Sequence, residues 1–257
     1  MLTYPEIDEI AFSIDVRWYG LMYLAGFACA WYLATLRARR PNALLTVEQV
    51  GDFIFYGAIG VIAGGRLGYV LFYGLDQWAD DWLFPIKINE GGMSFHGGLL
   101  GVITAMLIFA RQNKVAPWRL LDFLAPVVPP GLFFGRIGNF INNELWGKQT
   151  TLPWGFKVGG VVKHPSQLYE ALLEGLVLFL ILWFYSSKPR PTRAVSGLFL
   201  IGYGTFRLLI EFVRIPDAHL GYLAFGWLTM GHLLSLPMVL FGAYLIVTAY
   251  RSEPSAG

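Results

Sequence analysis

Long apolar segments limit what this chain can fold into. A helix of roughly 18–23 apolar residues is long enough to cross about 30 Å of hydrocarbon. The sequence contains seven such stretches, at residues 19–36, 51–73, 93–110, 119–137, 166–185, 195–213 and 227–249. The pattern predicts an all-α membrane protein, a bundle of about seven transmembrane helices held in a lipid bilayer.

The charge content agrees with a lipid setting and excludes several classes of function. Only 14% of the 257 residues are charged, whereas soluble domains carry about 25%. The net charge of +2, without a basic run that alternates with aromatic residues, argues against nucleic acid as a partner. One cysteine, Cys29, excludes an internal disulfide and a cysteine cluster, and His219 and His232 lack metal-ligand spacing. We therefore expect no metal ion and no cofactor.

The chain shows no long-period repeat, so a single integral membrane domain over residues 1–257 is the simplest organisation. Residues 142–165 are too many for a turn and contain Pro153, Gly155, Gly159 and Gly160. This segment is predicted to form a small extracytoplasmic cap with a short hairpin.

Basic residues set the expected orientation. Three lysines or arginines follow each of the first, third and fifth stretches, and Arg251 follows the seventh. The opposite side carries acidic residues, among them Asp76, Asp81 and Asp217. Because cytoplasmic loops are enriched in lysine and arginine, we expect a periplasmic N-terminus and a cytoplasmic C-terminus.

Polar side chains directly follow the fourth apolar stretch. Arg136, Asn139 and Asn143 fall at i, i+3 and i+7, on one face if the helix continues. A guanidinium and two carboxamides suit phosphate or ester oxygens. The alternative is structural, an Arg136–Glu144 pair that closes the helix end.

Counting helical rise places several functional side chains in the outer half of the membrane. They are Tyr19, Arg66, His96, Arg136, Arg207 and Glu211. Arg66, Arg136 and Arg207 have few carboxylates at the same depth to balance their positive charge. This excess favours a phosphate ligand. Neutralisation between packed helices is the alternative.

Spacing within the stretches points the same way. Tyr203, Arg207, Glu211 and Arg214 share one helix face, and Arg66, Tyr69 and Tyr73 share another. His96 lies beside glycines and could exchange protons or serve as a hydrogen-bonded packing residue.

Three further residues receive structural interpretations. Asp122 is expected to be a solvated charge at a helix end, Ser166 a helix cap and His164 mainly structural.

Six motifs then carry a resemblance to a known family. They are Trp18-Tyr-Gly-Leu-Met-Tyr, Gly65-Arg-Leu-Gly-Tyr, Met93-Ser-Phe-His-Gly-Gly, Gly135-Arg-Ile-Gly-Asn-Phe-Ile-Asn, His164-Pro-Ser-Gln-Leu-Tyr-Glu and Tyr203-Gly-Thr-Phe-Arg-Leu-Leu-Ile-Glu-Phe-Val-Arg. In this order, over nearly the whole chain, they closely resemble those of the bacterial prolipoprotein diacylglyceryl transferases. The resemblance implies transfer of a diacylglyceryl group from phosphatidylglycerol to the lipobox cysteine thiol of a prolipoprotein signal peptide. A thioether forms, glycerol phosphate leaves, and the setting is the bacterial cytoplasmic (inner) membrane.

The same resemblance implies roles for individual residues. Arg136 and Arg207 would contact the phosphate, with Asn139 assisting and Glu211 orienting Arg207. His96 would be the base for the thiol, and Tyr19 or a carboxylate could serve instead. The remaining expected substrate contacts are Arg66, Tyr69, Tyr73, Asn143, Glu144 and Tyr203. A transporter or flippase for an anionic phospholipid is the alternative function, but the sequence shows no paired halves or broken spans of the kind common in transporters.

Overall fold

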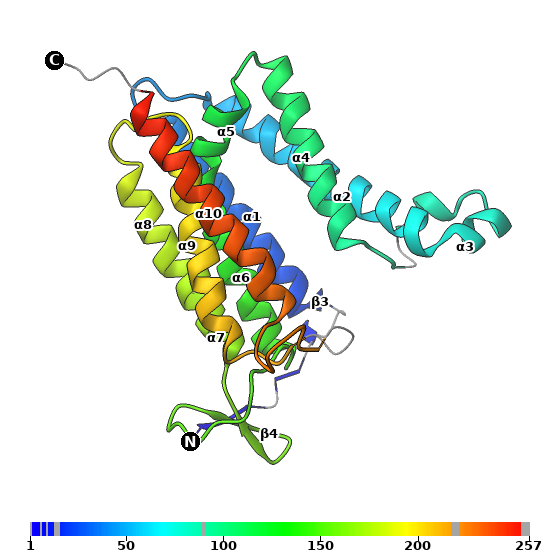
Figure 1. Cartoon of the computed structure of the whole chain (residues 1–257). Helices are drawn as coiled ribbons and strands as arrows, with labels where there is room; N and C mark the ends of the chain where they lie inside the picture. The colour runs from blue at the N-terminus through cyan, green and yellow to red at the C-terminus, as the bar shows by residue number, and fades with distance from the viewer. Residues whose placement is uncertain are drawn as a thin grey trace. The chain divides into compact units, whose positions relative to one another are not determined.

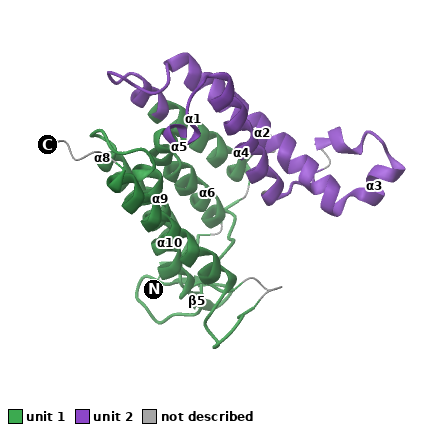
Figure 2. Cartoon of the chain, turned by 45° about the horizontal axis from the view of Figure 1, so that its top comes forward, with its two compact units in different colours: residues 1–33, 121–257 green, residues 34–120 purple. Residues whose placement is uncertain are grey.

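The computed structural model describes residues 2–5, 7–8, 10–12, 16–88, 91–216 and 221–252. The chain divides into two compact units, which are described separately. One comprises residues 1–33 and 121–257, and the other comprises residues 34–120 (Figure 2).

Helices make up most of the first unit (Figure 1). They are α1 (Trp18–Ala38), α5 (Pro117–Leu124), η3 (Ala125–Val127), α6 (Pro129–Ile141), α7 (Ser166–Glu170), η4 (Ala171–Val177), α8 (Leu178–Tyr185), α9 (Ala194–Glu211) and α10 (Met230–Arg251), with α1 and α5 crossing the unit boundaries. Helices α9 and α10 lie side by side (Figure 1). Their backbones approach closely, since a Cβ at Gly197 would be 2.9 Å from the Gly242 carbonyl oxygen. Small residues allow this close approach between membrane helices.

Two elements in this unit depart from regular α-helix. The expected continuous span at 119–137 is bent by 44° between η3 and α6, where Pro126, Pro129 and Pro130 lie. Proline removes a backbone donor and clashes with the preceding turn, so the helix breaks there. The sequence prediction of an unbroken span was therefore wrong. Element η4 is a π-helix between α7 and α8.

The hairpin expected within residues 142–165 is present. Strands β4 (Phe156–Val158) and β5 (Val161–Lys163) pair antiparallel. Gly159 and Gly160 between them have φ values of +57° and +84°, as a two-residue turn with two positive φ angles requires. Strand β1 (Leu2–Thr3) pairs in parallel with β4, and β2 (Ile10–Phe12) pairs antiparallel with β3 (Val16–Arg17).

The second unit contains α2 (Val47–Tyr73), α3 (Leu75–Asp80), η1 (Phe84–Ile86) and α4 (Phe95–Gln112). Thr46 and Gln49 form a capping box at the start of α2. Glycines bring α2 and α4 into backbone contact, since a Cβ at Gly64 would lie 2.4 Å from the Gly97 carbonyl oxygen.

Among the described residues, five helices are long and apolar enough to cross a membrane. They are Trp18–Ala38, Val47–Tyr73, Ser166–Tyr185, Ala194–Glu211 and Met230–Arg251. The bent pair Pro117–Val127 and Pro129–Ile141 brings the number to six if it forms one span. The third expected stretch, 93–110, overlaps the 18-residue helix α4 (Phe95–Gln112).

Asp122 has a different role from the one expected. Its Oδ2 accepts a hydrogen bond from the Arg193 backbone N–H at 2.6 Å, and its Oδ1 accepts from the Ser196 backbone N–H at 2.8 Å. The Ser196 hydroxyl adds a third bond at 2.6 Å. Asp122 thus caps the first turn of α9, whose free N–H groups need acceptors, and the prediction of a solvated charge was wrong.

Candidate functional site

Six charged side chains meet inside the first unit, and we call them the arginine–glutamate network. Helix α6 supplies an arginine, α7 and η4 each supply a glutamate, and α9 with the residues just after it supplies the rest. The members are Arg136, Glu170, Glu174, Arg207, Glu211 and Arg214.

Glu170 lies at the centre of this network. Its side chain is fully buried, and its Oε2 is 3.0 Å from Nε of Arg136. Its Oε1 accepts from Nη1 of Arg207 at 2.6 Å and from Nη1 of Arg214 at 3.1 Å. One carboxylate therefore joins arginines from α6 and from the end of α9.

Glu211 provides a second carboxylate contact for Arg207 and Arg214. Its Oε2 lies 3.0 Å from Nη2 of Arg207 and 3.6 Å from Nε of Arg214, at the spacings i,i+4 and i,i+3. Its Oε1 accepts a hydrogen bond from the Thr229 hydroxyl at 2.8 Å. The Thr229 hydroxyl lies 2.9 Å from Nδ1 of buried His232. The contact expected between Glu211 and Arg207 is present, and Thr229 extends it in a way that sequence spacing did not indicate.

Glu174 is buried but weakly paired. Its nearest cationic atoms are Nη2 of Arg136 at 3.8 Å and Nη1 of Arg207 at 3.9 Å. Neither carboxylate oxygen makes a hydrogen bond within the described part of the chain. Glu174 lies in the π-helix, an element that often occurs at functional sites, and neighbouring Gly175 packs directly on Phe133 of α6.

The network corrects the charge argument made from sequence. Arg136, Arg207 and Arg214 are matched here by three carboxylates, so the network itself carries no excess positive charge. Arg66, the remaining arginine of that argument, lies in the second unit and donates to backbone carbonyls. Glu170 and Glu174 were overlooked, although two carboxylates four residues apart in the apolar stretch 166–185 were a usable signal. The side chains of Arg136 and Arg207 keep 20% and 15% of their surface exposed, whereas those of Glu170 and Glu174 are fully buried.

The asparagines after Arg136 do not form the expected face. Helix α6 ends at Ile141, and Asn143 adopts a left-handed conformation with φ of 58°. Its side-chain oxygen accepts a hydrogen bond from Nε1 of Trp146 at 2.7 Å. The helix therefore does not continue to Asn143, and the condition for a shared face with Arg136 is not met at this residue. Asparagine tolerates this backbone region better than most residues.

Asn139 instead helps to hold Glu144. The side-chain amides of Asn139 and Asn142 each donate to the Glu144 carboxylate at 3.2 Å. Within the described residues, the ion pairs of Arg136 run to Glu170 and Glu174. The structural alternative of an Arg136–Glu144 pair is therefore replaced by this arrangement.

Two expected tyrosines lie in the same unit. The Tyr19 hydroxyl is 3.2 Å from the Tyr23 hydroxyl, and its ring packs on Gly138 of α6. The Tyr203 ring stacks on Phe199. Tyr203 also packs against the buried cluster of Ala125, Leu178, Leu182 and Val195.

The other expected residues belong to the second unit. The Arg66 guanidinium is buried and donates to the carbonyls of Phe84 at 2.5 Å, Pro85 at 3.2 Å and Gly92 at 3.3 Å, with a further bond to Gly91. These bonds indicate that Arg66 holds the segment before α4 in place rather than contacting a phosphate.

Tyr69, Tyr73 and His96 occupy different surroundings in that unit. Tyr69 lies against Gly92, whereas Tyr73 is 73% exposed. His96 is exposed in the first turn of α4, which Ser94 caps.

Two residues before and at the start of α7 serve the fold. Ser166 donates its hydroxyl hydrogen to the Leu145 carbonyl at 2.6 Å and does not cap α7, contrary to the sequence prediction. His164 lies 3.2 Å from the Tyr169 hydroxyl, and burial lowers the pKa of its imidazole. His219 and Asp217 lie outside the described residues.

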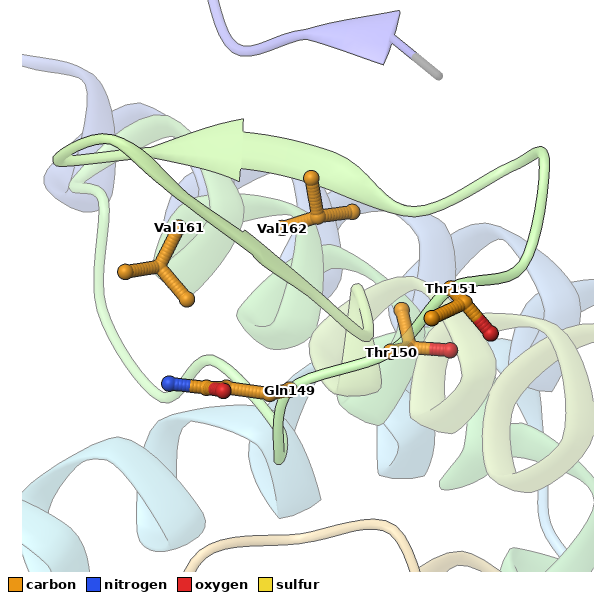
Figure 3. A pocket seen from close by; sticks show the side chains of 5 residues that line it. All are labelled: Gln149, Thr150, Thr151, Val161 and Val162. Atoms are coloured by element: carbon orange, nitrogen blue, oxygen red, sulfur yellow. The ribbon is translucent and has the colours of Figure 1, made fainter.

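A hollow of about 420 Å³ lies at the hairpin (Figure 3). Its lining residues are Gln149, Thr150, Thr151, Val161 and Val162. The described lining residues are uncharged, and none belongs to the arginine–glutamate network.

The fold and site together define a helical membrane protein with a buried arginine–glutamate network. The family model described as prolipoprotein diacylglyceryl transferase matches residues 5–248, and the chain belongs to this family.

Relatives named phosphatidylglycerol–prolipoprotein diacylglyceryl transferase match nearly the whole chain. The one from Methylococcus capsulatus is 56% identical, covering 97% of this chain and 98% of its own. Those from Azotobacter vinelandii and Pseudomonas aeruginosa are 56% and 54% identical, each covering 98% of this chain and 98% and 97% of their own.

Proposed function

We propose that this protein transfers a diacylglyceryl group from phosphatidylglycerol to the lipobox cysteine thiol of a prolipoprotein signal peptide. The observation that carries the proposal is the identity of 54–56% with the named relatives over nearly the full length of both chains. The arginine–glutamate network supplies a site that suits the chemistry.

In this reaction the thiol sulfur attacks the carbon of the diacylated glycerol that bears the phosphate. A carbon–sulfur bond forms, the carbon–oxygen bond breaks, and glycerol phosphate leaves with the electron pair. The thiol proton passes to a base. Negative charge grows on the leaving phosphate, so fixed positive groups beside it lower the barrier.

Arg136 and Arg207 are proposed to bind that phosphate. Arg136 uses Nε and Nη2 in its ion pairs within the described residues, which leaves Nη1 for a ligand. Glu170 holds both arginines in place before substrate arrives, and Glu211 adds a second contact to Arg207. Such preorganisation avoids a cost during the reaction. His96 remains the proposed base, with Tyr19 or a carboxylate as the alternative.

Further substrate contacts are proposed in each of the two units. Asn139 and Glu144 form one hydrogen-bonded pair beside Arg136. The complete proposed set adds Arg66, Tyr69, Tyr73, Asn143 and Tyr203 to Arg136, Asn139, Glu144 and Arg207. Of these, Arg66 and Asn143 are supported least, because their polar groups already bond to other parts of the protein.

We also propose how the helices cross the membrane and on which side each terminus lies. Seven spans result if α4 and the bent α5–α6 segment each cross the inner membrane, with the N-terminus periplasmic and the C-terminus cytoplasmic. Residues 142–165 would then form the periplasmic cap of a single membrane domain. A lipid flippase is not favoured, since the relatives are named as transferases.

Mass spectrometry of a lipobox peptide tests the function directly. Purified full-length protein with phosphatidylglycerol should add the mass of one diacylglyceryl group to the peptide, and a peptide with serine in place of the cysteine should gain none. Movement of the lipid between leaflets without any change in peptide mass would favour the flippase.

A further inference from the structure

Glu174 differs from the other two carboxylates of the network. Its side chain is fully buried, yet its closest cationic atoms are 3.8 and 3.9 Å away. Glu170 makes three contacts at 2.6–3.1 Å, and Glu211 makes one at 3.0 Å and accepts from Thr229. A buried carboxylate without hydrogen bonds is costly to keep charged.

Charged and titratable groups face Glu174 from three elements. Glu170 comes from the end of α7, four residues before Glu174, and Arg136 comes from α6. The others come from α9 and the residues just after it. The full set is Arg136, Glu170, Tyr203, Arg207 and Arg214. The network as a whole carries as many carboxylates as arginines.

An anionic lipid changes this balance. The phosphodiester of phosphatidylglycerol brings one negative charge, and uncompensated charge is expensive in a poorly hydrated interior. One proton on a carboxylate restores neutrality. Glu174 is the carboxylate whose neutralisation breaks no short ion pair, and it also frees the two arginines proposed to hold the phosphate.

We propose that Glu174 takes up one proton from solvent when the phosphate of the lipid binds Arg136 and Arg207. The lipid charge and the proton charge cancel, so the bound complex keeps the net charge of the empty network. Glu174 then acts as a positioning residue, because it competes with the phosphate for the arginines when charged and releases them when neutral. This inference rests on the proposed function.

Calorimetry tests the proton uptake. The full-length protein in detergent is titrated with phosphatidylglycerol in buffers that differ in ionisation enthalpy, so that the heat reports protons taken up. We expect uptake of about one proton per lipid near neutral pH, and an affinity that falls by up to about tenfold per pH unit once Glu174 is charged in the free protein. Phosphatidylcholine, whose headgroup has no net charge, should cause no uptake.

Two variants separate Glu174 from other acids. Glu174→Gln should bind phosphatidylglycerol without proton uptake and with an affinity that no longer depends on pH in this range. Glu48→Gln, at an exposed position in the first turn of α2, should behave as the unmodified protein does. If Glu174→Gln does not fold, proton uptake on lipid binding can still be measured in the unmodified protein and in Glu174→Asp, which keeps a titratable carboxylate.

The outcomes are distinguishable from failure of the proposed function. Binding and transfer without proton uptake, or uptake that persists in Glu174→Gln, overturn the inference and leave the transferase function intact. Absence of both phosphatidylglycerol binding and peptide modification overturns the proposed function, and the inference with it.

Discussion

Arg136 combines a structural contact with a partly exposed guanidinium. Its Nε is 3.0 Å from Glu170, and the side chain keeps 20% of its surface exposed. Truncation of Arg136 would remove charge from beside buried carboxylates, and breaking such a pair typically costs about 3–5 kcal/mol. A variant that keeps the charge is therefore the sharper test of its proposed role.

Arg136→Lys should fold but transfer poorly. Lysine keeps the positive charge near Glu170, whereas the planar fork that suits a phosphate is lost. We expect the transfer rate to fall by about 100-fold or more, as for loss of one preorganised donor, with only a small change in thermal midpoint. Near-normal turnover of the lipobox peptide would remove Arg136 from the site.

His96→Asn tests the proposed base through pH. Asparagine keeps polarity and approximate size but cannot accept the thiol proton. An unperturbed cysteine has a pKa of about 8.5, so thiolate is scarce near neutral pH. We expect a large rate deficit at pH 7 that shrinks toward pH 9, with little change in peptide binding. A deficit that stays constant over this range would indicate packing, and the base would then be sought at Tyr19 or a carboxylate.

At the scale of elements, the π-helix η4 packs against α6, and these two elements carry Glu174 and Arg136. Gly175 allows their contact, because a Cβ there would lie 2.6 Å from the Phe133 Cβ and 3.1 Å from its backbone nitrogen. These atoms are the Cβ and backbone of Phe133 on α6, so they cannot shift without moving the helix itself.

Gly175→Ala should therefore impair stability and activity together. Overpacking of this kind costs about 1–3 kcal/mol, and separation of η4 from α6 would loosen the Arg136 contacts. Gly131→Ala on α6 is the matched control, since a Cβ there meets nothing within 4 Å. Thermal unfolding in detergent and peptide transfer measure both effects. Equal behaviour of the two variants would show that the contact is dispensable.

Asp122→Ala should destabilise α9. The substitution removes the acceptor for the N–H groups of Arg193 and Ser196, and loss of a helix cap costs about 0.5–2 kcal/mol. We expect a lower thermal midpoint with lipid affinity largely retained, because Asp122 contacts no member of the arginine–glutamate network among its described bonds. An unchanged midpoint would contradict the capping role.

At the scale of the whole molecule, orientation decides which leaflet supplies the lipid. The basic loops predict that Gly159 in the hairpin turn faces the periplasm and that Thr192 before α9 faces the cytoplasm. A cysteine introduced at residue 159 should react with an impermeant reagent in intact cells, and one at residue 192 only after the membrane is opened. The reverse pattern would overturn the proposed topology.

The sequence alone determined where the apolar helices lie and which residues share a face within each helix. Both follow from local properties, the length of an apolar run and the helical period, so α1, α2, α4, α9 and α10 fall close to the expected ranges. The hairpin was equally local, because Gly159 and Gly160 permit the backbone angles of its turn.

Only the tertiary structure decided what those faces contact. Arg207 meets Glu170 across 37 positions of the sequence, and Asp122 meets Ser196 across 74. Helical periodicity shows which way a side chain points but not which neighbour packs against it, so the neutral network was read as an excess of positive charge. The pairing became visible only when α6, α7 and α9 were packed together, because Glu170, which contacts all three arginines of the network, is distant in sequence from each of them.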